Sequence, residues 1–234
     1  MSSLWPLLPM ALLMVGLALA LRAGIAGAIG LLSAPALLLL GAGLVCADSA
    51  CHSPAFDIAG MALAAQGQGP LADVFFRVLT WAGSIVVLGP LAIGLAIHAW
   101  QRQPGSPKPA RPQALFVPVA LAGAALMAYA TKLAIARPRP EVAALIEMPA
   151  DASYPSAHAL QISAFVAAWL LAPGRSTGPP RPAPIALAML LVVLVAWSRL
   201  HLQVHYPGDI LFALAAGAVW VVTLRQLPGW RASS

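Results

Sequence analysis

The stretch "WSRLHLQVHYPGDI", residues 197–210, brings together side chains that can do chemistry, namely Arg199, His205 and Asp209. They stand in a chain in which 61% of the residues are hydrophobic and only 9% are charged. Burying ionisable groups in apolar surroundings is energetically unfavourable, and such groups usually mark functional sites. We therefore take this stretch as the first part of a candidate site.

Two further stretches supply matching groups. "TKLAIARPRPE" carries Lys132 and Arg139, and "SYPSAHAL" carries Ser156, Ala157 and His158 where an apolar helix should begin. Arginine forks and a lysine charge neutralise phosphate oxygens. The N–H groups at a helix start bind anions as well. The residue types together favour phosphoryl transfer.

The histidines and the aspartate can share this reaction. His205 can act as the nucleophile and His158 can protonate the departing oxygen. Asp209 follows His205 by four residues, a spacing that places both on one face of a helix. From there Asp209 can hold the tautomer of His205.

The elements that carry these residues are predicted to be transmembrane helices, because the chain is far more apolar than soluble proteins. We expect an all-α, polytopic helix bundle that forms a single transmembrane domain over residues 1–234. Residues 53–78 are too broken by Gly and Pro to span, so we expect them to lie along the outer interface as one wall of the access route. The seven apolar windows are residues 4–21, 25–46, 79–100, 114–130, 159–171, 183–198 and 210–224.

Charge placement predicts the orientation. Eight of the 13 basic residues lie in short connections without acids, which the positive-inside rule places in the cytoplasm. All seven acids lie on the opposite side. We expect an inner or plasma membrane protein with a cytoplasmic C-terminus and the site facing outside or the periplasm. The net charge of +6 reflects this topology, and no basic face for nucleic acid is present.

Two features near the N-terminus concern processing and crosslinking. No Lys or Arg precedes the first apolar window, so we interpret residues 1–24 as an extra transmembrane helix and not as a cleaved signal peptide. Cys46 and Cys51 fall on the outer side, where a disulfide and two free thiols are equally good interpretations.

The three stretches resemble a known family in order and spacing. Lys132 followed after six residues by Arg139-Pro140, then Pro155-Ser156-Ala157-His158, then Ser198-Arg199 with His205 and Asp209, resemble the signature motifs of the type 2 phosphatidic acid phosphatase superfamily. The resemblance implies a six-helix phosphatase core, here within residues 25–228. It also implies a metal-independent lipid phosphatase without a cofactor, which works through a phosphohistidine on His205.

By the same resemblance, Asp209 orients His205, and His158 is the general acid. The resemblance also assigns a set of phosphate-binding residues: Lys132, Arg139, Ser156, Ala157 and Arg199. The family usually has glycine where this chain has Ala157, so we expect activity with an altered rate or substrate tolerance. The implied substrates are membrane lipid phosphates such as undecaprenyl diphosphate, phosphatidylglycerol phosphate or phosphatidic acid. No obligate protein partner is evident.

Several alternatives stay open. The same site could pass its phosphoryl group to a lipid hydroxyl, which would make the protein a phosphotransferase, or the fold could serve a non-catalytic transporter or scaffold. Arg137 lies outside the matched positions; it could help to bind phosphate, or it could be an interfacial charge paired with Glu141. His201 and His205 are spaced like a metal pair, but the HExxH pattern is missing, so we predict no metal site.

Overall fold

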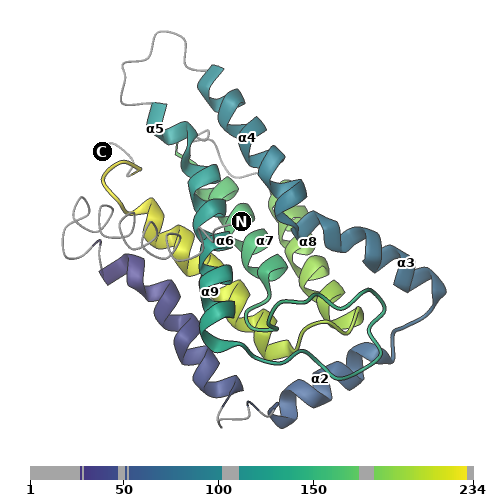
Figure 1. The fold of residues 1–234 in the computed structure, drawn as a ribbon. Helices are drawn as coiled ribbons and strands as arrows, with labels where there is room; N and C mark the ends of the chain where they lie inside the picture. The colour runs from purple at the N-terminus through teal and green to yellow at the C-terminus, as the bar shows by residue number, and fades with distance from the viewer. Residues whose placement is uncertain are drawn as a thin grey trace, which may run out of the picture.

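The computed structural model describes residues 27, 29–46, 51, 53–101, 111–173 and 182–230, and this part of the chain contains helices and no strand (Figure 1). The predicted all-α fold class is therefore confirmed. The elements are the helix Ile29–Val45, α2 (Ala55–Ala65), α3 (Pro70–Leu79), the 3-10 helix η1 (Thr80–Gly83), α4 (Ile85–Gln101), α5 (Arg111–Ala114), α6 (Phe116–Ile135), α7 (Ala157–Leu171), α8 (Pro182–His201) and α9 (Pro207–Arg225).

Six of the seven apolar windows coincide with these helices. The first window and the expected extra helix of residues 1–24 lie outside the described residues. Within the described ranges, three helices, α6, α8 and α9, are long and apolar enough to cross a membrane. The pair formed by α3 with η1 and α4 would count as a fourth span despite its 46° bend. Residues 25–228 as the limits of the core stay a prediction.

α7 lies at the centre of the bundle. Its side chains are buried on several faces, as expected for a helix surrounded by protein. It packs most extensively against α9 and next against α6. α9 approaches closely at Gly217, where an added Cβ would lie 2.7 Å from the carbonyl oxygen of Leu160. The N-terminus of this central helix is therefore held firmly in place.

The segment predicted to lie along the outer interface forms α2 and α3, separated by residues 66–69. α3 leaves Leu71, Val74, Phe75 and Val78 exposed, while its polar side faces α8 through Asp73. α2 buries Asp57, Met61 and Ala64. An exposed apolar stripe beside a polar contact is typical of an interfacial helix. The position of α3 in the membrane interface stays a prediction.

The connections at one end of the bundle form a compact layer. Ala136 adopts a left-handed conformation with φ 51° and ends α6, and the connection that follows contacts residues near the end of α8 and in the middle of the Ile29–Val45 helix. Leu145 N–H donates to the carbonyl of Leu202, and Tyr154 Oη donates to the carbonyl of Leu38. Cys46 and Cys51 are joined by a disulfide, one of the two alternatives left open by the sequence.

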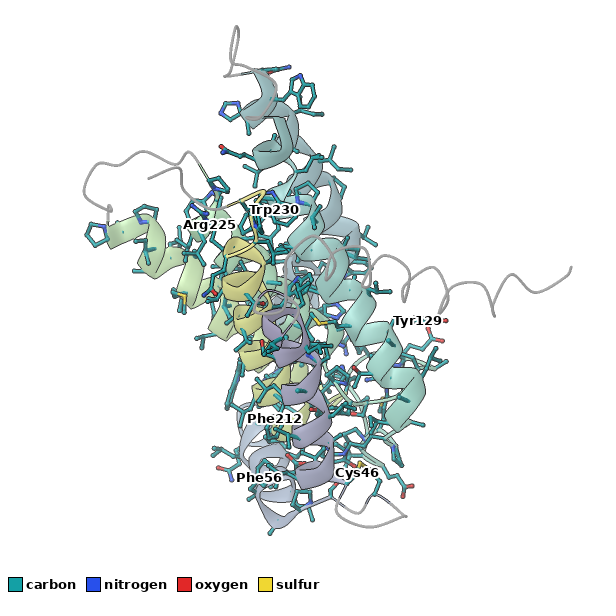
Figure 2. The ribbon with its side chains drawn as sticks, turned by 90° about the vertical axis from the view of Figure 1, so that its left-hand side faces the viewer. Cys46, Phe56, Tyr129, Phe212, Arg225 and Trp230 are labelled. Atoms are coloured by element: carbon teal, nitrogen blue, oxygen red, sulfur yellow. A yellow bond between two sulfur atoms is a disulfide. The ribbon has the colours of Figure 1, made fainter. Side chains whose placement is uncertain are left out.

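Figure 2 shows the two ends of the bundle apart: Cys46 and Phe56 lie at one end, and Arg225 and Trp230 lie towards the other. The connection between α6 and α7 lies at the same end as α2 (Figure 1).

Candidate active site

Four helix ends meet at this end of the bundle and carry the residues that the sequence singled out. α6 contributes Lys132 from its last turn, and the chain after it contributes Arg139. α7 begins at Ala157 with Ser156 as its N-cap residue, while Arg199 lies in the last turn of α8. The connection between α8 and α9 carries His205, and the first turn of α9 carries Asp209.

Lys132 and Arg139 converge on one carboxylate, that of Asp151. Lys132 Nζ lies 3.2 Å from Oδ2 of Asp151, and Arg139 Nη2 lies 2.5 Å from Oδ1. Burial alone would raise the pKa of Asp151, but the two cations outweigh this effect and hold that pKa below its usual range. Lys132 and Arg139 are nearly buried, whereas Asp151 is 55% exposed. The two cations thus form an anion site that is open to the outside and occupied by a side chain.

His205 lies beside this anion site. Its Nε2 is 3.4 Å from Nη1 of Arg139, which also donates to the carbonyl of Val204 at 2.6 Å. Burial and the charges of Arg199, Arg139 and Lys132 lower the pKa of His205 well below 6.5. The imidazole is consequently neutral at physiological pH, with a lone pair available for attack on an anion held by Arg139.

Nδ1 of His205 faces Asp209, with a separation of 3.5 Å between Nδ1 and Oδ2. This distance is long for a hydrogen bond, as is common for catalytic pairs before a ligand binds. The expectation that both residues lie on one helical face is wrong. Pro207 starts α9, so His205 precedes the helix in the turn and only Asp209 is helical.

The carboxylate of Asp209 is completely buried and has several donors. Oδ2 accepts from the N–H of Tyr206 at 2.9 Å and from Ser153 Oγ at 2.5 Å. Oδ1 accepts from Arg137 Nη1 at 2.6 Å. The first-turn position on α9 adds favourable interaction with the helix dipole. Asp209 is therefore fixed before any substrate arrives.

The start of α7 carries polar groups that could bind a ligand. Ser156 Oγ is buried and has no hydrogen-bond partner among the described residues, although the N–H of Ser156 donates to the carbonyl of Asp209. The first N–H groups of any α-helix lack partners within the helix, and here they point out of the N-terminus of α7. Ala157 is the first helical residue, so it has a right-handed backbone that alanine adopts without strain.

Arg199 and His158 are both contacted by η1, an element that the sequence did not connect with the site. Arg199 Nη1 donates to Thr80 Oγ1 at 2.6 Å, and its Nε has no hydrogen-bond partner in the part of the chain that the structure describes. A Cβ added at Gly83 would lie 3.2 Å from Cβ of His158, which shows how closely η1 approaches this residue. No residue type in "TWAG" signals this role.

The comparisons with known proteins decide the family. The sequence model of the PAP2 superfamily matches residues 113–233, just over half of the chain. The chain belongs to the PAP2 superfamily. The resemblance found in the three motifs is therefore confirmed, and all three motifs lie within the matched residues.

Relatives of this PAP2 chain include decaprenylphosphoryl-5-phosphoribose phosphatase of Mycobacterium tuberculosis. It is 40% identical over 108 residues, which make up 45% of this chain and 55% of that protein. A protein of Escherichia coli strain K12 named as a candidate undecaprenyl-diphosphatase, YbjG, is 36% identical over 83 residues, 36% of this chain and 37% of that protein. The chain thus spans about half or less of the length of these curated relatives.

Solved structures agree on the fold. The transmembrane PAP2-type phosphatidylglycerolphosphate phosphatase of Bacillus subtilis superposes with a TM-score of 0.65 at 22% identity, covering 82% of this chain and 94% of that chain. Aquifex aeolicus LpxE superposes with a TM-score of 0.58 at 20% identity, covering 73% and 95%. At these identities the likeness concerns the fold alone. Together with the spanning helices, it makes this PAP2 chain an integral membrane protein.

The structure corrects the interpretation of Arg137. Its guanidinium is fully buried between Asp57 and Asp209, with no exposure to an incoming anion and no pairing with Glu141. Asp57 belongs to α2, outside the residues that the family matches. A charge placed in an otherwise apolar helix was the one sequence signal that could have marked Asp57 as a site residue.

His201 and His205 do not face a common partner. Nε2 of His201 lies 2.8 Å from Oδ1 of Asp73, and its ring packs on Phe76. His205 faces Arg139 and Asp209. His201 thus connects α8 to α3.

Proposed function

We propose that this protein is a membrane lipid phosphatase that hydrolyses the phosphate monoester or diphosphate of a polyprenyl lipid through a phosphohistidine intermediate on His205. The observation that carries the proposal is the position of Arg139. Its guanidinium contacts both an anion, the carboxylate of Asp151, and the ring nitrogen of His205. A phosphate that replaced this carboxylate would lie beside the nucleophile.

The first step forms one bond and breaks another. Nε2 of His205 attacks phosphorus while the bond from phosphorus to the lipid oxygen, or to the bridging oxygen of a diphosphate, breaks. His158 gives its proton to the departing oxygen. Lys132, Arg139 and Arg199 stabilise the charge on the transferring phosphoryl group. The N–H groups at the start of α7 and the unpaired Ser156 Oγ can add hydrogen bonds to the same oxygens.

The second step regenerates the histidine. His158 removes a proton from water, the water oxygen attacks phosphorus, and the bond between phosphorus and His205 breaks. Inorganic phosphate leaves, and the proton remains on His158 for the next cycle. Asp209 stabilises the positive charge that His205 acquires in the intermediate. This sequence of steps requires no metal ion.

The names of the curated relatives favour a polyprenyl substrate. The curated relatives at 36–40% identity are named for decaprenyl and undecaprenyl lipids, whereas the structural neighbours named for other lipids lie at 20–22%. The position of the site at helix ends supports a membrane lipid of any class, because a phosphate at headgroup level would keep its tail in the bilayer. The charge distribution supports an outward or periplasmic location.

The test is phosphate release by the detergent-purified protein in excess EDTA, with His205→Ala as a matched inactive variant. The panel contains a polyprenyl phosphate, a polyprenyl diphosphate, phosphatidylglycerol phosphate and phosphatidic acid. We expect release from the polyprenyl lipids that survives the chelator and is lost in the variant. Release that stops with EDTA would contradict the metal-independent mechanism. Release from the glycerophospholipids alone would contradict the substrate class. Transfer to an added lipid alcohol without release of phosphate would identify a phosphotransferase.

A further inference from the structure

Arg137 is a buried cation that the reaction steps above leave without a role. Its side chain has no exposed surface, yet it ends in two short ion pairs. Nη1 lies 2.6 Å from Oδ1 of Asp209, and Nη2 lies 2.6 Å from Oδ2 of Asp57. The guanidinium carbon lies 4.2 Å from the centre of the Tyr206 ring. One guanidinium thus joins two carboxylates from α2 and α9 and packs against a residue next to His205.

The pairing sets the orientation of Asp209. Because Arg137 binds Oδ1, the carboxylate directs Oδ2 towards Tyr206 N–H, Ser153 Oγ and Nδ1 of His205. Ser153 is fixed in turn, since its N–H donates to the carbonyl of Arg137 at 2.8 Å. A rotation of the Asp209 carboxylate would break several of these contacts at once. Arg137 therefore determines which carboxylate oxygen of Asp209 faces His205.

Asp57 holds Asp209 by a second route. Its Oδ1 accepts the N–H of Gly208 at 2.7 Å, and Gly208 precedes Asp209 in the chain. The approach is close, because an added Cβ at Gly208 would lie 3.2 Å from Oδ1 of Asp57. Asp57 thus contacts Arg137, which pairs with the Asp209 side chain, and also the backbone N–H of Gly208, the residue before Asp209.

A purely stabilising role does not require this arrangement. Buried ion pairs contribute little net stability relative to apolar residues of similar volume, because desolvation opposes the attraction. The close approach of the two carboxylates also depends on Arg137. Without this cation, Asp57 and Asp209 would face each other as buried like charges. The arrangement fits a need for a fixed orientation of the Asp209 carboxylate.

We propose that Arg137 and Asp57 are positioning residues that keep the Asp209 carboxylate directed at His205, so that α2 forms part of the catalytic apparatus although it lies outside the three motifs. The inference rests on the proposed phosphatase function. Neither residue contacts the substrate, so both act on the rate of phosphoryl transfer and not on binding.

The experiment compares kcat and KM for phosphate release in four proteins: wild type, Arg137→Met, Asp57→Asn and the double variant Arg137→Met/Asp57→Asn. Arg77→Met serves as the matched control, because Arg77 is an exposed arginine on α3. Size-exclusion chromatography and thermal unfolding in detergent show whether each protein is folded. Arg137→Lys is included as a milder change, since a lysine keeps the charge but cannot bridge both carboxylates with a rigid fork.

We expect Arg137→Met to lower kcat by roughly 10²-fold at an unchanged KM, the scale of a misplaced catalytic group. The double variant should recover kcat by about tenfold relative to Arg137→Met, because the unpaired charge opposite Asp209 is gone and residues in contact couple on this scale. Arg137→Lys should give a kcat between those of wild type and Arg137→Met. Arg77→Met should match wild type.

Three results would overturn the inference: a wild-type kcat in folded Arg137→Met or Arg137→Lys, a rise in KM that accounts for the loss, or a double variant no faster than Arg137→Met. If Arg137→Met does not fold, Arg137→Lys decides by the same criteria. A folded wild type that releases no phosphate would contradict the proposed function first, and the inference would fail with it. An active wild type with unaffected variants would contradict the inference alone.

Discussion

At the scale of single residues, the cations that surround His205 determine its protonation state and the attraction of the site for phosphate. Arg199, Arg139 and Lys132 make the imidazolium form of His205 unfavourable and lower its pKa well below 6.5. The same charges would attract a phosphate oxygen. One set of cations therefore keeps the nucleophile neutral and also binds its target.

This arrangement predicts the pH dependence. Protonated His205 cannot attack, so kcat/KM should fall as the pH drops through the His205 pKa, and the lowered pKa places this acid limb below 6.5. Arg199→Gln removes a positive charge, which should raise the His205 pKa and move the limb to higher pH. It should also lower the rate by about 10²-fold through loss of transition-state stabilisation. The phosphate of a bound substrate favours the protonated form of His158, so the loss of this proton from the enzyme–substrate complex should add a basic limb to the kcat profile.

The measurement is the kcat/KM profile of both proteins on one substrate, so that the ionisation of the substrate cancels in the difference. A kcat profile from the same measurements that shows no basic limb up to about pH 9 would argue against His158 as the proton donor. An acid limb that does not move in Arg199→Gln would remove Arg199 from the charges that act on His205.

Asp151 allows a second prediction at this scale. Its carboxylate occupies the anion site between Lys132 and Arg139, so an incoming phosphate has to displace it. Asp151→Asn should therefore strengthen inhibition by inorganic phosphate, with an inhibition constant lower by roughly two- to tenfold, the size of one or two partly exposed ion pairs. Glu147→Gln, a change to an exposed acid in the same connection, is the control. An unchanged or higher inhibition constant would mean that Asp151 supports the cations and does not compete with phosphate.

The sequence could predict which residues gather but not all of their partners. Local spacing within short stretches identified Lys132, Arg139, His158 and Arg199, and the structure brings them to one end of the bundle. The pairing of Arg137 with Asp57 joins residues 80 positions apart, and nothing local marks such a contact. His205 was placed on a helix because spacing of four suits a helical face, but Pro207 begins the helix after it.

At the scale of elements, the geometry of the site depends on how α7 and α9 pack. α7 carries His158 at its start and α9 carries Asp209 at its start, and the two helices share the largest interface in the described structure. The apolar windows of residues 159–171 and 210–224 located both helices in the sequence. They could not locate η1 at the site, because that contact depends on the bend between α3 and α4.

Gly217→Ala tests this dependence. The added methyl would lie 2.7 Å from the carbonyl oxygen of Leu160 and 3.0 Å from Cβ of Ser163, so the helices have to separate. We expect a loss of about 1–3 kcal/mol in stability from overpacking, together with reduced turnover. Gly94→Ala on α4 is the control: no atom lies within 4 Å of its added Cβ, and the change should stabilise the helix by up to about 1 kcal/mol. Equal unfolding temperatures and rates in the two variants would contradict the predicted role of this contact.

At the scale of the whole molecule, the site lies at one end of a membrane-spanning bundle, and the charge distribution assigns that end to the outside. Cys46 and Cys51 lie at the site end, and Arg225 lies towards the other end (Figure 2). The sequence likewise assigns the seven acids to the side opposite the connections that carry most basic residues. The orientation is a prediction of the sequence that the fold alone does not test.

Thiol labelling in intact cells provides that test. After mild reduction, a membrane-impermeant thiol reagent should label Cys51. In a Cys46→Ser/Cys51→Ser background, a cysteine introduced by Gln101→Cys at the end of α4 should react only after lysis, because Gln101 lies beside the basic connection assigned to the cytoplasm. The reverse pattern would invert the topology and place the site in the cytoplasm.

The most direct test of the central claim is to trap and locate the intermediate. A polyprenyl phosphate or diphosphate labelled in its terminal phosphate is mixed with purified protein, quenched at alkaline pH and analysed by mass spectrometry. We predict an acid-labile phosphate on His205 that is absent from His205→Ala. A phosphate on another residue, or turnover by His205→Ala at the wild-type rate, would contradict the account.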